Sequence, residues 1–195
     1  MTQDFVEAHA DRIDAVVGEF ESRLASVVDE VKIRLSDKLY SSLEVVDGMV
    51  AQNPGNAVEV NQVGDRYLQF LAAAGFASLV SAFVGQFSNQ VDEFLAVVED
   101  VRANSPGVPA ASLGDADRGV LGAQAASAQV ALESHKLVVA SALRQLSAMV
   151  GSGYSVGDLV GSVLEIVDGT MRIVPLAKDL LMSFFRLVGD LVYRN

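Results

Sequence analysis

The two histidines, His9 and His135, are the side chains with which catalysis or metal binding would most readily begin. Nucleophilic catalysis needs a nucleophile beside a base, but the chain has no cysteine and neither histidine lies in a recognisable motif. A metal site on one helix needs two ligands four residues apart, and the residue four positions after His9 is Ile13. We therefore expect both histidines to be solvated helix-surface residues, and we expect no metal and no cofactor.

Close pairs of acidic residues are a second possible source of chemistry. General acid–base catalysis needs carboxylates with perturbed pKa values inside a cleft, whereas these pairs fall on the polar faces of predicted helices. Di-iron helical bundles need Glu-x-x-His pairs, and the sequence contains none. We predict solvated carboxylates and no catalytic residues at Asp11/Asp14, Asp29/Glu30, Asp92/Glu93, Glu99/Asp100 and Asp115/Asp117.

A glycine-rich segment at 151–153 precedes a predicted helix, whose N-terminus attracts anions. No lysine follows the segment and no strand precedes it, so a turn between two helices is the better interpretation. The sequence therefore predicts a protein that is not an enzyme. The remaining enzymatic hypothesis is an active site built from carboxylates far apart in the sequence, and no group of residues in the sequence supports it.

Composition bounds the class of protein further. Hydrophobic residues make up 51% of the 195 residues and charged residues 20%, which excludes a disordered chain. The 25 acidic residues outnumber the 14 basic ones, for a net charge of -11. Affinity for nucleic acid comes mainly from Lys and Arg that neutralise phosphates, so no direct nucleic-acid binding is expected.

The first residues lack the basic-then-apolar order of a secretory signal. The longest charge-free apolar run, residues 71–84, is shorter than the roughly 20 residues that a membrane span needs. We expect a cytoplasmic protein, unless the chain belongs to a virion.

Apolar residues recur every three or four positions through most of the chain, which is the helical period. The pattern predicts an all-α fold in which long antiparallel helices form an elongated bundle, with a shorter C-terminal helical part. The predicted regions are a long helical hairpin at 1–102, a Pro/Gly linker at 103–115 and a C-terminal helical region at 116–195. The predicted helices cover residues 4–51, 57–102, 116–150, 155–168 and 170–193, with Pro175 in the first turn of the last helix or at a kink.

The third predicted helix is rich in small residues, and small residues at a seam let two helices approach closely. We expect its buried stripe to consist of Val120, Ala123, Ser127, Val130, Leu132, Leu137, Ala140, Leu143, Leu146 and Val150.

The stretch 71–84 is apolar on all sides of its predicted helix. Such a helix is either buried all round as a central core helix or exposes a patch for a partner subunit. The candidate partner-interface residues are Phe76, Phe83 and Phe87 in this region and Leu180, Phe184 and Leu187 in the C-terminal stripe. Each of the six also suits a plain core position.

Three features occur in order in the C-terminal part of the chain. A helix rich in small residues ends in a turn at 151–155, and a helix with an acidic residue near its start, Asp158, follows. The segment Leu176-Ala177-Lys178-Asp179 comes about twenty residues later. In these features residues 116–193 resemble the C-terminal helical part of the Mu F-like head-morphogenesis family of phage minor head proteins.

That family carries Ile-Ala-Arg-Thr-Glu in the last of these segments, whereas this chain has Lys178, Asp179 and Leu180 in place of Arg, Thr and Glu. Pro175 before the segment is a further departure from the pattern. The resemblance implies a virion component near the portal that contacts portal or capsid proteins.

These observations together predict a non-enzymatic structural or assembly protein that acts through helix–helix interfaces, as a phage virion component near the portal or inner capsid. The expected partners are proteins, either copies of itself or other virion proteins such as portal or capsid. The alternative is a membrane-active helical protein, such as a phage ejection protein or pore former, motivated by residues 71–84 and the apolar C-terminus. Membrane contact is not favoured, because surface-binding helices carry Lys and Arg on their polar face, whereas the polar faces here are acidic.

Overall fold

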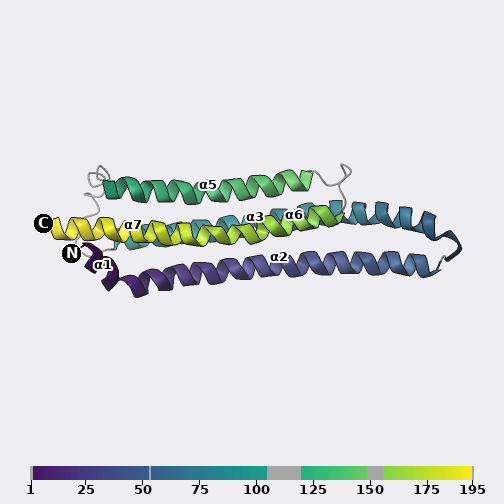
Figure 1. Cartoon of the computed structure of the whole chain (residues 1–195), viewed down its shortest axis with the longest axis horizontal. Helices are drawn as coiled ribbons and strands as arrows, with labels where there is room; N and C mark the ends of the chain where they lie inside the picture. The colour runs from purple at the N-terminus through teal and green to yellow at the C-terminus, as the bar shows by residue number, and fades with distance from the viewer. Residues whose placement is uncertain (1, 53, 105–119, 149–155, 195) are drawn as a thin grey trace. The chain divides into compact units, whose positions relative to one another are not determined.

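A computed structural model of the chain describes residues 2–52, 54–104, 120–148 and 156–194. These residues form α-helices and two short 3₁₀ turns, with no strand among them (Figure 1). The predicted all-α helical bundle is confirmed. The helices are α1 (Thr2–Ala8), α2 (Ala10–Gln52), α3 (Ala57–Ala103), α5 (Val120–Ala148), α6 (Val156–Gly169) and α7 (Ile173–Arg194), with 3₁₀ turns η1 (Pro54–Asn56) and η2 (Thr170–Arg172).

The first predicted helix is broken at His9, so the prediction of one continuous helix from residue 4 to 51 is wrong. The backbone N–H of His9 donates to the carbonyl of Val6 at 3.1 Å, which closes a tight turn at the end of α1. The N–H of Ile13 donates to the carbonyl of His9 at 3.0 Å and starts the regular pattern of α2. The apolar period continues through this break, so periodicity alone gives no sign of it.

The packing divides the chain into two compact units. Unit 1 comprises Met1–Ala25, Phe87–Val138 and Thr170–Asn195, and unit 2 comprises Ser26–Gln86 and Val139–Gly169. Each unit draws on both the predicted hairpin and the predicted C-terminal region, because α2, α3 and α5 each contribute residues to both. The predicted linker lies almost wholly outside the described residues, as does the predicted turn at 151–155.

The core of unit 1 is formed by α2, α3, α5 and α7. The rings of Phe20 on α2 and Phe94 on α3 lie 4.7 Å apart between centroids, at an angle of 36°. Arg23, one turn after Phe20, pairs with Glu93, just before Phe94, as expected for antiparallel helices. Buried apolar side chains of this unit are Ile13, Val17, Phe20, Leu24, Phe87, Val91, Phe94, Val98, Val101, Leu132, Ile173, Ala177, Leu180, Leu181, Phe184, Phe185, Leu187 and Val188.

Unit 2 has a core of its own. Among its described side chains, the buried apolar ones are Val28, Val31, Leu35, Val80, Phe83, Val84, Val139, Ala140, Leu143, Val163 and Val167. An ion pair between Lys32 and Asp168 joins α2 to the end of α6 at its surface.

The apolar stretch of α3 is not buried all round where its side chains are described. Val80, Phe83 and Val84 are buried, whereas the small residues Ala77, Ser78, Ser81 and Ala82 are exposed. A small side chain adds little apolar area to the surface, so this part of α3 has a buried side and a solvent side despite its uniform composition. The expectation of a helix enclosed on every side is therefore wrong for residues 77–84.

The last two helices end and begin close to the residues that the sequence predicted. Helix α6 ends at Gly169, and Thr170 begins the turn η2, where its side chain is fully buried. Helix α7 starts at Ile173, which places Pro175 in its first turn. The missing N–H of proline has no intrahelical partner to lose at that position, so the first-turn alternative for Pro175 is correct.

Candidate functional site

The described residues contain no group of three His, Asp or Glu side chains placed to hold a metal ion. Asp92 and Glu93, one of the acidic pairs, are both exposed, and each forms an ion pair with a basic residue of another helix. These two carboxylates lie on the surface and not in a cleft of the kind in which general acid–base catalysis takes place.

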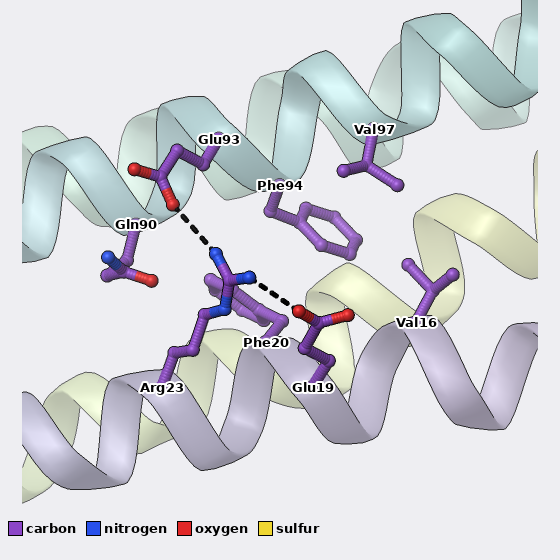
Figure 2. Close-up of a pocket in the computed structure, with 8 residues that line it drawn as sticks. All are labelled: Val16, Glu19, Phe20, Arg23, Gln90, Glu93, Phe94 and Val97. Carbon is purple, nitrogen blue, oxygen red and sulfur yellow. Dashed lines mark hydrogen bonds and ion pairs between the residues drawn. The ribbon is translucent and has the colours of Figure 1, made fainter.

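A small hollow lies in unit 1 between α2 and α3 (Figure 2). Arg23 donates to Glu19 at 2.5 Å and to Glu93 at 3.0 Å, and in Figure 2 its guanidinium lies between these two carboxylates, in front of Phe20. The other lining residues are Val16, Gln90, Phe94 and Val97. Its volume is about 70 Å³, well below the roughly 300–1,000 Å³ of ligand pockets. The hollow is best described as an aromatic contact covered by a surface ion-pair network.

His9 is a packing residue of unit 1, and the expectation that it is solvated is wrong. Its ring stacks on Phe5 with centroids 4.3 Å apart, and it lies 5.2 Å from the ring of Phe185 on α7. Its Nδ1 lies 2.9 Å from the carbonyl oxygen of Phe5. A Cβ added to Gly189 would lie only 3.1 Å from the Cβ of Phe5. Because Phe185 and Gly189 are one turn apart, they form one surface of α7, against which α1 packs.

His135 on α5 is half-buried and its Nε2 atom is enclosed, so it is not a solvated surface residue either. The next residue, Lys136, donates to Asp92 at 2.6 Å and joins α5 to α3 within unit 1. This side of α5 therefore faces the interior of the unit.

Five of the six candidate interface residues lie in the interior of the single chain. Phe83, Phe87, Leu180, Phe184 and Leu187 are each no more than 6% exposed. The side chain of Phe76 lies outside the described part of the chain. In this arrangement the five side chains form core contacts, and a partner could contact them only after the helices had separated.

The most prominent candidate surface is on α5, where sequence reasoning expected burial. Val130, Leu137 and Val138 are 61%, 65% and 65% exposed. The prediction placed Val130 and Leu137 in the buried stripe, but the side chains that α5 buries are Leu132, Val139, Ala140 and Leu143. We call the exposed set the outer face of α5; it consists of Ser127, Val130, Ala131, Ser134, Leu137, Val138 and Ser141, all exposed.

The outer face of α5 carries no charged side chain. The two acidic or basic residues between positions 127 and 141 are Glu133 and Lys136, which are half-buried. Glu133 accepts a hydrogen bond from Gln129 at 3.2 Å, and Lys136 pairs with Asp92. A sequence signal for this face did exist, because Leu137, Val138 and Val139 are consecutive, and at 100° per residue three consecutive side chains cannot all lie on one buried stripe.

The fold and these surfaces define an all-α helical-bundle protein. Among the described residues, no helix combines the length and the apolar character that crossing a membrane requires. Comparisons with protein-family models, with curated proteins and with solved structures found no match to this chain.

Proposed function

We propose that this chain is a non-enzymatic structural protein that assembles with other protein chains through helix–helix interfaces. The observation that supports the proposal best is the outer face of α5, where three large apolar side chains are at least 61% exposed within nine residues. Soluble monomers rarely expose contiguous apolar patches, and those that do generally use them for binding.

The chemistry of the described surface is consistent with this role. Arg23 is hydrogen-bonded to two carboxylates, and Lys136 and Lys178 each pair with an aspartate. These basic groups are thus engaged within the chain and are not gathered into a site that would hold a phosphate or a carboxylate ligand. Apolar contact between helices is the interaction for which this surface is best suited.

The setting that we propose for this assembly role is a phage virion, with portal or capsid proteins as further partners. This finer proposal rests on the resemblance of residues 116–193 to phage minor head proteins. Co-purification with a portal or capsid protein from the same source would support it, and a chain found only outside particles would contradict it.

The assembly role is tested by the molar mass of the purified full-length chain. Light scattering across a concentration series is expected to show a mass that rises from the monomer value of 20.6 kDa toward a defined multiple. Exposed apolar residues associate more as concentration increases, by mass action. A mass of 20.6 kDa at every concentration up to the millimolar range would contradict the proposal in its self-assembly form.

A further inference from the structure

We infer that the outer face of α5 packs against the same face of a second copy of this chain, with the two helices antiparallel and a two-fold axis near Ser134. This inference rests on the proposed assembly function and specifies both the surface and the partner. It starts from the cluster of Val130, Leu137 and Val138, which are the large apolar side chains exposed on α5.

The outer face of α5 reads nearly the same in both directions from Ser134. Val130 and Val138 lie four residues before and after it, and Ser127 and Ser141 lie seven residues before and after it. Ala131 and Leu137 occupy the positions three residues away. At 3.6 residues per turn all seven positions fall within about 120° of arc around the helix.

An antiparallel pair of such helices makes matching contacts along its whole length. With the axis at Ser134, a residue n positions before Ser134 meets the residue n positions after it in the second copy. Val130 then meets Val138, serine meets serine, and the bulky Leu137 meets the small Ala131. A two-fold interface requires that one surface be complementary to itself, and this arrangement of large and small side chains satisfies the requirement.

Charge does not oppose the pairing of two copies at the outer face of α5. Two copies that each carry a net charge of -11 repel one another wherever their carboxylates meet. On the outer face of α5 they meet without any charged side chain, because Glu133 and Lys136 are half-buried and hydrogen-bonded within their own chain. A nucleic acid or a basic protein would find no complementary charge on this face.

The size of the face sets the expected strength of the contact. Residues 127–141 span roughly 20 Å of helix, so one such contact buries less than the roughly 800 Å² per partner of a stable interface. We therefore expect a weak dimer that forms at high protein concentration. Experiments must include concentrations near the dissociation constant.

The first test replaces Leu137 by Glu and compares it with a matched control, Ile33→Glu. The two side chains are similarly exposed, at 65% and 61%, but Ile33 lies on a different helix, α2, and is not part of the outer face of α5. By sedimentation equilibrium on the full chain, Leu137→Glu is expected to raise the dimer Kd by about tenfold or more, and Ile33→Glu to leave it within about twofold. Unchanged far-UV circular dichroism of both variants excludes unfolding as the cause.

The second test uses the absence of cysteine from the chain. In Ser134→Cys the new thiols would lie at the two-fold axis, and mild oxidation is expected to give a disulfide-linked dimer. Ser22→Cys, at an exposed serine of α2 between Glu21 and Arg23, is the control and should not cross-link. A mixture of Ala131→Cys and Leu137→Cys chains should cross-link more than either alone if the helices are antiparallel.

The outcomes separate this inference from the proposed function. An oligomer that is unaffected by Leu137→Glu and does not cross-link through Ser134→Cys overturns the α5 pairing but leaves the assembly role intact. A wild-type chain that is monomeric at all concentrations overturns the α5 pairing and the self-assembly form of the proposed function. Binding of the monomer to vesicles of zwitterionic lipid, lost in Leu137→Glu, would assign the face to a membrane and overturn the pairing.

Discussion

Helices α7 and α5 both contribute to unit 1, yet they differ in how their apolar side chains are used. Helix α7 buries most of the large apolar side chains that are described, including Leu181 and Phe185, and exposes the charged residues Lys178, Asp179 and Arg186. Helix α5 buries Leu132 but leaves Leu137 and Val138 exposed. Both helices are rich in apolar residues, but only α5 exposes a group of large apolar side chains to solvent among the described residues.

The difference follows from where charged residues lie in the two sequences. On α7, charged side chains mark one side, so a single orientation buries the apolar stripe and leaves Lys178, Asp179 and Arg186 in water. On α5, burying either side of the helix would bury few charged side chains. The side that faces inward is therefore the one that packs against the neighbouring helices and lets Lys136 pair with Asp92. An apolar side left outside in this way is free to bind a partner.

The largest expected effect in this comparison is the loss of a core side chain from α7. Phe184→Ala is expected to reduce the free energy of unfolding by about 3–5 kcal/mol, because it removes a buried aromatic ring and leaves a cavity. Leu137→Ala on α5 should change it by less than about 0.5 kcal/mol. Chemical denaturation followed by circular dichroism, at a concentration where the chain is monomeric, measures both. A small loss for Phe184→Ala together with weakened assembly would show instead that α7 faces a partner.

An intermediate effect is expected from filling the close contact between α7 and α1. Gly189→Leu places a side chain where Phe5 packs, and such overpacking typically costs about 1–3 kcal/mol. The change should also displace α1 from α7, so the proton resonances of the His9 ring should lose the shift caused by the ring of Phe185.

Gly85→Leu is the matched control for this substitution. Gly85 lies in α3, and a Cβ there would meet nothing within 4 Å, so the variant should be as stable as wild type or more stable, since leucine favours a helix over glycine. Equal stability of the Gly189→Leu and Gly85→Leu variants would mean that α1 is not held against α7.

The smallest effect is expected on the charged side of α7. Lys178 donates to Asp14 at 2.8 Å, and this hydrogen bond, together with the attraction of the carboxylate, raises the pKa of Lys178 above its ordinary 10.5. A pKa that is raised in the folded state stabilises the fold at pH values below the unfolded value of 10.5 and ceases to do so as pH rises through the folded value. Lys178→Met should therefore be slightly less stable than wild type at neutral pH, and the difference should vanish in strongly alkaline solution.

Arg23→Met is a useful control for that pH series. Arg23 also forms an exposed pair with a carboxylate of another helix, Glu93, but guanidinium groups stay charged in alkaline solution. The effect of Arg23→Met should persist where that of Lys178→Met is lost. Denaturation curves of the two variants across the alkaline range measure the contrast, and parallel loss of both effects would exclude titration of Lys178 as the cause.

Much of the fold could be predicted from local patterns. The helical period identified the all-α class, and Gly169 and Thr170 marked the junction before the last helix, because turn and capping preferences act within a few residues. The candidate interface could be predicted less well. Phe83 and Phe184 were predicted as interface candidates that also suit a core, and both are buried within the chain, because an apolar residue at helical spacing has the same sequence signature in a core and at an interface.

Residue types and their spacing along single helices are enough to show that this protein is helical, acidic and without cysteine chemistry. The turn at His9 and the exposure of Val130, Leu137 and Val138 became evident from the packing of the helices. The turn places α1 and His9 against Phe185 and Gly189 of α7, and the orientation of α5 involves the pairing of Lys136 with Asp92. These are contacts between residues far apart in the sequence, and the helical period of a single segment does not encode them.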